Sequence, residues 1–307
     1  MLRDGDRAAD IYATASRVVV GERKAIGRAI SIVESGEVSA RALLRTLAPH
    51  LGHALVVGVT GPPGAGKSTL VGLLISKLLE QYVTVGALLV DPSSPRTKGA
   101  ILGDRMRFAR GSMRGALFTR SLASRGHLGG LTDTLSAVID VLDAAKFPVV
   151  IVEAVGGGQA DVEINDLADL TLVLSPPGLG DDVQAIKAGV LEIADFIVVT
   201  KCDRPGAEAA RQQLALMVSH SSVPGESRKV LAVSSTTGEG VGELMDEIVS
   251  RLRPSRCEVR CVGGVRSYRS GAESPSWRRA VCGSRRLIRR IPMARSYARA
   301  GRRGARN

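Results

Sequence analysis

The chain has 307 residues, enough for one large domain or two small ones, and its 44% hydrophobic content is ample for a buried core. No apolar run approaches the roughly 20 residues of a membrane-spanning helix and the first residues lead into no secretory signal, so we expect a cytoplasmic protein without a membrane partner. The net charge of +12 comes from residues 254–307, where 15 Arg and two acids give +13, so the preceding residues sum to −1.

Residues 10–48 are predicted to be helical, with a first break at Ser35 and Gly36. Before that break, apolar residues recur at helical spacing on one stripe, which includes Ile26, Ala29, Ile30 and Val33. A second amphipathic helix is expected over residues 40–47. We interpret residues 1–50 as a helical extension that packs as a cap on a nucleotide-binding domain of residues 51–253.

A glycine-rich turn follows the extension and is the strongest motif of the chain. The apolar, β-branched run at residues 55–60 predicts a buried parallel strand before the turn, and residues 70–79 have helical spacing after it. Strand, turn and helix in this order are the context that a phosphate-binding P-loop requires. The turn reads G-x-x-x-x-G-K-S-T and comprises Gly61, Pro62, Pro63, Gly64, Ala65, Gly66, Lys67, Ser68 and Thr69.

The residue types in this turn suit phosphate binding. Glycines let backbone N–H groups converge on phosphates, and the N-terminus of the helix adds its positive end. Lys67 is expected to reach the β- and γ-phosphates, and the Ser68 hydroxyl to ligate Mg²⁺. A glycine turn that binds nothing is the alternative, but a chance match with both flanking elements is rare. We therefore expect a nucleoside triphosphate and Mg²⁺ as cofactors.

Three acidic residues are candidates for the metal side of this site. A second buried strand at residues 84–90 ends in Asp91, and carboxylates at strand ends lie where open α/β sheets bind ligands. Asp91 and Asp104 bracket a polar segment and are candidates to hold Mg²⁺ directly or through water. Asp104 is equally well explained as the cap of a helix that begins near Arg105. The third strand, residues 149–153, ends in Glu153.

Glycines follow Glu153, an arrangement that P-loop NTPases use to set a metal-side carboxylate beside a sensor of the γ-phosphate. Gly156 is expected to offer its N–H to that phosphate, and with Lys67, Asp104 and Glu153 it forms our catalytic set. Gln159 either orients a water molecule or is an ordinary surface glutamine, and the second interpretation is the more common one.

A base-reading loop is predicted after the strand at residues 196–199, which follows a further strand at 170–174. The sequence Thr-Lys-Cys-Asp at 200–203 is a variant of N-K-x-D, in which the acid accepts hydrogen bonds from guanine that adenine cannot supply. Lys201 and Asp203 are therefore expected to select guanine. A sixth strand begins at residue 230, and the loop at its end suits a second base contact through Ser234, Ser235 and Thr236. A closing helix is predicted at residues 241–252.

With these motifs assembled, residues 21–253 resemble the methylmalonyl-CoA mutase-associated GTPases, a branch of the P-loop GTPases. Some members of this branch have been described as arginine or ornithine transport ATPases or kinases. Glutamate at position 153, where most GTPases place aspartate, is typical of the branch. The distinctive stretches are residues 61–68, 91–94, 101–105, 128–130, 153–159 and 184–189.

The resemblance implies an α/β fold, a mostly parallel sheet flanked by helices, and a GTPase that converts GTP to GDP and phosphate with Mg²⁺. It implies that Lys67, Ser68 and Thr69 hold phosphates and Mg²⁺, with Asp91, Asp104 and Glu153 in the metal and water shell. The loop with Asp104 would be the first switch and residues 154–160 the second. A third switch at 175–187, with Asp181 and Lys187, would face the partner.

The implied function is that of a chaperone. The nucleotide state would gate cofactor loading into an adenosylcobalamin-dependent acyl-CoA mutase and protect the mutase from inactivation. Relatives form homodimers through a C-terminal helical arm. Here residues 254–307 have no apolar period, and their Arg-rich, Gly- and Ser-containing composition predicts a disordered tail or an out-of-frame reading of a GC-rich gene. We therefore expect weaker dimerisation.

Two further departures from the family concern the site, because Ala154 replaces a usual Thr and Thr200 replaces the Asn of the base loop. Two alternative functions stay open. An ATP-using kinase or an ATPase associated with basic amino-acid transport would need no guanine contact at Asp203. A nucleic-acid-binding protein would use the Arg-rich tail on phosphate backbones without sequence preference, but no aromatic residues are interleaved to stack on bases.

Overall fold

A computed structural model of the chain describes residues 4–36, 38–82, 84–92, 116–124, 130–154, 164–178, 194–221 and 228–252. By its internal contacts the chain divides into two units, Met1–Cys261 and Val262–Asn307, and all described residues belong to the first. Asp104, Gly156, Gln159, Asp181, Lys187 and the predicted tail lie outside the described residues.

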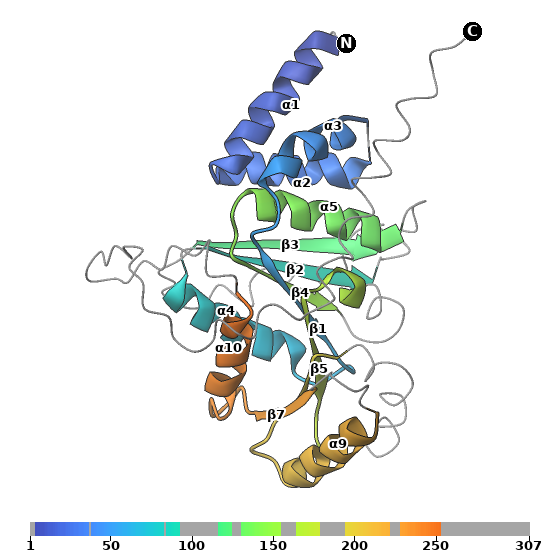
Figure 1. The fold of residues 1–307 in the computed structure, drawn as a ribbon, viewed down its shortest axis with the longest axis vertical. Coiled ribbons are helices and arrows are strands. Elements are labelled where there is room, and N and C mark those ends of the chain that lie inside the picture. The colour runs from blue at the N-terminus through green and yellow to red at the C-terminus, as the bar shows by residue number, and fades with distance from the viewer. Residues whose placement is uncertain are drawn as a thin grey trace, which may run out of the picture. The chain divides into compact units, whose positions relative to one another are not determined.

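In the part of the chain that the structure describes, the centre of the first unit is a seven-stranded sheet in the order β3-β2-β4-β1-β5-β6-β7, and its six strand pairs are parallel. This confirms the predicted α/β fold (Figure 1). Four inner strands are fully buried, as expected of apolar strands covered on both faces. The strands are β1 (Leu55–Thr60), β2 (Thr84–Pro92), β3 (Ala116–Ser124), β4 (Val149–Ala154), β5 (Leu170–Ser175), β6 (Phe196–Thr200) and β7 (Lys229–Val233).

Strand β3 was not among the six predicted strands. Its sequence, ALFTRSLAS, places Thr119, Arg120 and Ser121 in the middle of an otherwise apolar run. A strand at the edge of a sheet has a partner on one side only, so its sequence is less uniformly apolar than that of an inner strand. Tertiary packing therefore decides that these residues are extended.

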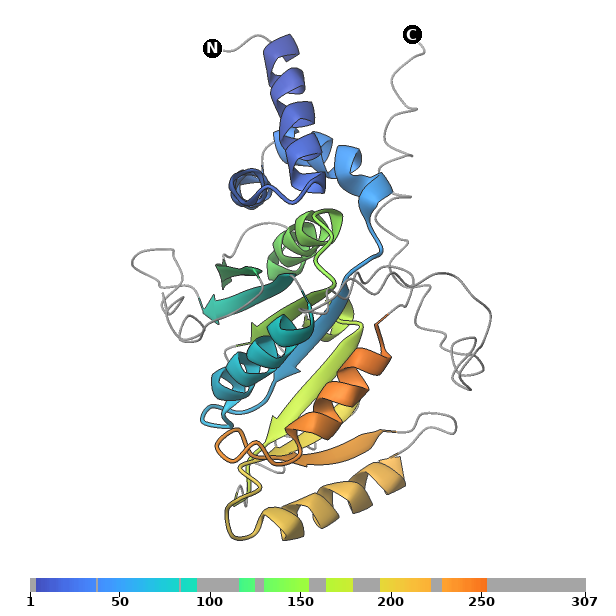
Figure 2. The same cartoon turned by 90° about the vertical axis from the view of Figure 1, so that its left-hand side faces the viewer.

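Helices cover both faces of the sheet. The helix α4 (Lys67–Gln81) shares one hydrophobic cluster with α10 (Val241–Ser250), and Figure 2 shows these two helices side by side across one face. The opposite face packs against α5 (Gly130–Ala144), and α9 (Ala207–Ser221) packs on β6 and β7. A further helical turn lies at residues 164–167.

The N-terminal extension consists of α1 (Asp4–Val19), α2 (Arg23–Ser35), α3 (Val38–Leu47) and the 3₁₀ turn η1 (Ala48–His50). The predicted break at Gly36 is confirmed, because this residue is left-handed and its N–H reaches the carbonyl of Val33. The unbroken helix expected before it is wrong. Gly21, at φ +79°, ends α1, and a glycine in the left-handed region stops a helix without steric cost.

The extension and the part of the chain that contains the sheet share one hydrophobic core. Buried residues of α1, α2 and α3, among them Val18, Ile30 and Leu43, belong to the same cluster as α5 and as one face of β2, β3 and β4. The extension therefore buries its apolar stripe on α5, as a cap would. Among the residues that the structure describes, none of the helices has the length and apolar content needed to cross a bilayer.

Candidate functional site

The predicted P-loop connects β1 to α4. Gly61 has φ +143°, and a β-carbon there would lie 2.5 Å from the carbonyl oxygen of Leu174 in β5, so only glycine fits. Gly66, at φ +89°, precedes the first residue of α4, where it accepts a hydrogen bond from the N–H of Leu70 at 2.9 Å. The turn thus leads the backbone directly into the N-terminus of a helix, where anions bind readily.

The side chain of Lys67 lies over this turn. Its Nζ donates hydrogen bonds to the carbonyl oxygens of Gly61 at 2.7 Å and Pro62 at 3.0 Å. The side chain is buried, with 7% of its surface exposed. These contacts hold a positive charge above the helix N-terminus, where it adds to the field of the backbone N–H groups.

Ser68, in the first turn of α4, and Glu153, near the end of β4, come together. The Ser68 hydroxyl donates a hydrogen bond of 2.5 Å to Oε1 of Glu153. Strand pairing sets this geometry, because Glu153 of β4 lies opposite Val59 of β1. A hydroxyl and a carboxylate are the hard oxygen ligands that Mg²⁺ prefers, so the chemistry of this pair fits the expected ion.

Of the other residues predicted near the metal, the structure describes only the backbone of Asp91. Asp91 lies at the end of β2, and its backbone is paired with Ala123 of β3. Because Leu89 of β2 lies opposite Glu153, Asp91 is on the same edge of the sheet as Glu153. Asp104 and Gly156 lie outside the described residues. Ala154, the departure beside Glu153, is fully buried in the core shared with the extension, where a threonine hydroxyl would need a partner.

The predicted base loop is tied to the P-loop by two hydrogen bonds. The Thr200 hydroxyl donates to the carbonyl oxygen of Ala65 at 2.7 Å, and Nζ of Lys201 donates to that of Gly64 at 2.9 Å. Thr200 is buried, and Lys201 has a left-handed backbone at φ +54°. Thr200, noted from sequence only as a departure, therefore joins the two loops together with Lys201.

A pocket of about 120 Å³ lies where these loops meet a third loop, which follows β7. Arg204 lines this pocket although no motif position in the sequence marks it. The residues that line the pocket are Ala65, Gly66, Thr69, Thr200, Lys201, Asp203, Arg204, Ser235 and Thr236.

The surroundings of Asp203 favour the ionised form of its carboxyl group. A hydrogen bond from the Ser234 hydroxyl is the main cause that lowers the pKa of the Asp203 carboxyl, and the charge of Arg204 contributes. Ser234 has no exposed surface, and its oxygen accepts the N–H groups of Thr236 at 3.3 Å and Thr237 at 3.2 Å. Ser234 therefore supports Asp203 from behind, while Ser235 and Thr236 line the pocket.

Comparison with known proteins identifies the family. The family described as "Methylmalonyl Co-A mutase-associated GTPase MeaB" matches residues 26–269, which includes the first part of the expected tail. A protein of Pyrococcus abyssi whose name describes it as a GTPase is 44% identical over 236 residues, which are 76% of this chain and 73% of that protein. The mouse "Methylmalonic aciduria type A homolog, mitochondrial" is 34% identical over 248 residues, covering 75% of this chain and 60% of the mouse protein.

Among solved structures, that of "LAO/AO transport system kinase" superposes with a TM-score of 0.61 at 28% identity. The likeness covers 81% of this chain and 76% of the other. The fold, the P-loop and the sequence matches thus agree over the same residues. The chain belongs to the MeaB family of methylmalonyl-CoA mutase-associated GTPases and is a P-loop GTPase that binds GTP and GDP.

Proposed function

We propose that this GTPase is a chaperone of an adenosylcobalamin-dependent acyl-CoA mutase of the methylmalonyl-CoA mutase type. Its nucleotide state gates cofactor loading and protects the mutase from inactivation. The family match over residues 26–269 carries this proposal, because the family is named for its association with that mutase. The name of the mouse relative, which refers to methylmalonic aciduria, agrees with the same partner.

Residues of the P-loop bind the phosphates, and residues of the P-loop and of β4 hold the metal ion. Lys67 and the backbone N–H groups of residues 61–69 bind the phosphates, with Thr69 at the pocket wall. Ser68 and Glu153 would hold Mg²⁺, with Asp91 and Asp104 completing the shell, and the ion would neutralise charge that develops on the phosphates. Gly156 donates its N–H to the γ-phosphate. The contact between Ser68 and Glu153 supports this assignment.

The base side selects guanine. Asp203 accepts hydrogen bonds from N1 and N2 of the base, Lys201 lies along the ring, and the backbone around Ser235 and Thr236 provides a further contact. Adenine lacks the two donors, so it would leave a desolvated carboxylate without partners. The lowered pKa of Asp203 supports this role, because only the ionised carboxylate accepts both bonds.

A second candidate function is an ATP-using kinase or ATPase associated with basic amino-acid transport. One observation favours it, namely the likeness, at a TM-score of 0.61, to a solved structure described as a transport system kinase. The ionised Asp203 at the pocket favours guanine over adenine, so we rank this function second.

The partner surface and the domain limits are further parts of the proposal. We propose that Asp181 and Lys187 form a third switch toward the mutase. We also propose that the protein dimerises more weakly than its relatives, because residues 254–307 stand where those relatives have a helical arm. Residues 51–253 form the GTPase domain, and residues 254–307 are dispensable for nucleotide binding. A chain that ends at Arg253 and keeps its GDP affinity, with a sedimentation profile no less dimeric, would support these limits.

The decisive experiment follows mutase activity over time with this protein and GTP, GDP or no nucleotide. GTP is expected to prolong activity relative to the other two conditions. The Asp203→Asn variant provides the matched control, because protection should then require xanthosine triphosphate instead of GTP. Equal decay of mutase activity under all conditions would contradict the chaperone function, whatever the rate of GTP hydrolysis.

A further inference from the structure

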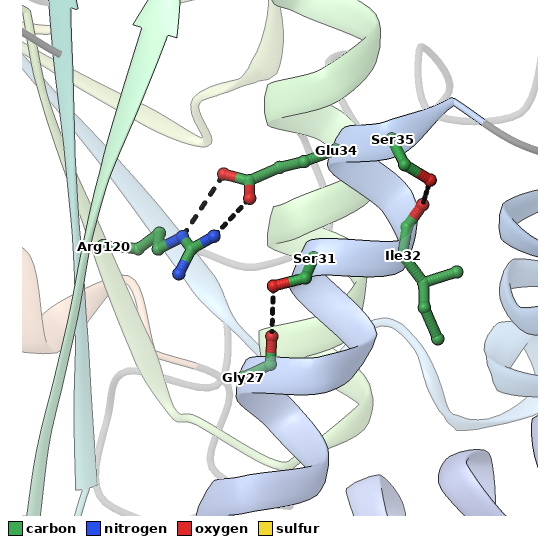
Figure 3. A network of polar contacts seen from close by, with 6 residues as sticks. All are labelled: Gly27, Ser31, Ile32, Glu34, Ser35 and Arg120. Carbon is green, nitrogen blue, oxygen red and sulfur yellow. Dashed lines mark hydrogen bonds and ion pairs between the residues drawn. The ribbon is translucent and has the colours of Figure 1, made fainter. Parts of the chain in front are cut away.

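An ion pair joins the N-terminal extension to the edge of the sheet. Nε of Arg120 in β3 donates a hydrogen bond to Oε1 of Glu34 in α2 at 3.2 Å, and Nη2 bonds the second carboxylate oxygen. Figure 3 shows this pair crossing from helix to strand, whereas the hydroxyls of Ser31 and Ser35 bond carbonyl oxygens of α2 itself. Both charged side chains are mostly buried, with 25% and 21% of their surfaces exposed.

Neighbouring contacts hold the same face of β3. The guanidinium of Arg23, at the start of α2, lies 5.8 Å from the centre of the Phe118 ring. Phe118 in turn meets Phe147 edge to face, with ring centres 6.2 Å apart. Leu122 is buried in the core that β3 shares with the extension. Alternate residues 118, 120 and 122 thus all point toward the helices.

A partly buried ion pair such as this one is more a directional contact than a source of stability. Desolvation of both charges offsets much of their attraction, and well-packed apolar residues usually stabilise a protein as effectively. A two-bond contact between a planar guanidinium and a carboxylate nevertheless fixes the relative position of its two carriers. The contact of Arg120 with Glu34 therefore sets where β3 lies relative to α2.

Strand β3 is linked to the phosphate site by strand pairing. It is paired with β2 along its whole length, from Thr84 opposite Ala116 to Pro92 opposite Ser124. Ser121, the residue after Arg120, lies opposite Leu89, which lies opposite Glu153.

We propose that Glu34 and Arg120 are positioning residues for GTP hydrolysis. Acting through the pairing of β3 with β2, they hold the end of β2, on which Asp91 lies, at a fixed position relative to Glu153 in β4. The inference rests on the proposed role of Asp91 in the site. Guanine binding is independent of the pair, because the base pocket is built from the P-loop and the loops after β6 and β7, on the other side of β1. The N-terminal extension then contributes to GTP hydrolysis through Glu34.

The test compares Glu34→Gln with Asp10→Asn. Asp10 of α1 pairs with Arg28 of α2 at 2.6 Å within the extension, and both side chains are about half exposed. Single-turnover GTP hydrolysis is expected to fall about tenfold in Glu34→Gln and to stay at the wild-type rate in Asp10→Asn. Affinity for labelled GDP should be unchanged in both. Hydrogen exchange of the amides of residues 116–124 should accelerate only in Glu34→Gln.

A second variant, Arg120→Lys, keeps the charge but loses the two-bond geometry. It should fold even if the first variant does not, and its hydrolysis rate should lie between those of Glu34→Gln and the wild type. Wild-type hydrolysis in both variants, or equal losses of hydrolysis and GDP affinity, would overturn the inference. The Glu153→Gln variant separates the two hypotheses, because full hydrolysis in that variant would refute the proposed metal side itself.

Discussion

The Ser68 hydroxyl donates a 2.5 Å hydrogen bond to Glu153, and this contact joins the first turn of α4 to the end of β4 across 85 positions of sequence. Glu153 is buried, with 6% of its surface exposed, and Val59 lies opposite it in β1. The pairing of β1 with β4 therefore determines which carboxylate meets the P-loop serine. Substitutions of four side chains in the nucleotide site, and of Asp143 in α5, test the roles assigned to these residues.

Replacing Glu153 by Gln should slow hydrolysis more than it weakens binding. The amide keeps the shape and one acceptor oxygen but removes the negative charge beside Ser68, which matters most when charge develops on the γ-phosphate. We expect single-turnover hydrolysis to fall about 100-fold, with GDP affinity nearly unchanged. Glu80→Gln, on the exposed end of α4, is the control. An unaltered rate in the Glu153 variant would remove this residue from the site.

Replacing Lys67 by Ala should abolish tight triphosphate binding. The buried ammonium lies over the P-loop, held by the carbonyl oxygens of Gly61 and Pro62, and no other side chain on this turn carries a charge. We expect a loss of about 3 kcal/mol in GTP binding, roughly a factor of 100. The measurement is a titration with a non-hydrolysable GTP analogue. Lys77→Ala, farther along α4, should bind normally, and equal losses in both variants would contradict the assignment.

Replacing Asp203 by Asn should change the base preference from guanine to xanthine. Wild-type protein should bind labelled GDP far more tightly than ADP, and equal affinities would refute guanine selection. The Ser234 hydrogen bond lowers the pKa of Asp203 in the folded protein. Folding therefore favours the ionised form of Asp203. In the folded protein the carboxylate stays ionised at any pH above the usual aspartate pKa of about 4, and it is protonated only when the pH falls through its lower folded pKa. GDP affinity should accordingly show no loss from Asp203 protonation between about pH 5 and 7.

Replacing Thr200 by Val should loosen the connection between the two nucleotide-binding loops. Valine has nearly the same shape but leaves the carbonyl oxygen of Ala65 without its 2.7 Å hydrogen bond. The expected loss is about 1–3 kcal/mol of unfolding free energy, together with weaker GDP binding. Thr200→Ser keeps the hydroxyl and should recover most of both. Denaturant unfolding and GDP titration measure the two effects, and wild-type values in the valine variant would contradict the role.

Asp143 holds the start of β1, and its replacement should affect stability alone. This buried carboxylate accepts the N–H groups of Gly52 at 2.6 Å, His53 at 2.7 Å and Ala54 at 2.8 Å. Alanine at 143 would leave three N–H groups without this acceptor, at a cost of about 3 kcal/mol or more in unfolding free energy. Asp143→Asn keeps one acceptor oxygen and should lose less. Equal stability of the alanine variant and wild type in urea would show that water replaces the carboxylate.

The sequence by itself determined the elements whose signals are local. The strand at 55–60, the turn with Gly61 and the helix after Lys67 follow one another without a gap, so their spacing predicts both their structure and their phosphate chemistry. The inner strands were also predictable, because strands buried on both faces must be apolar throughout. The family resemblance rested on these same contiguous stretches.

Only the tertiary structure decided the contacts between distant segments. The partners of Thr200 and Glu34 lie 135 and 86 positions away, and neither periodicity nor a motif connects such pairs. Ser234 suited a base contact by its position, but burial aims its hydroxyl at Asp203 instead. Strand β3 carries polar residues in its middle, and one of them, Arg120, meets the carboxylate of Glu34 in α2, which is 86 positions away. Burial, and the partner it demands for each polar group, depends on the whole fold and not on neighbouring residues in the chain.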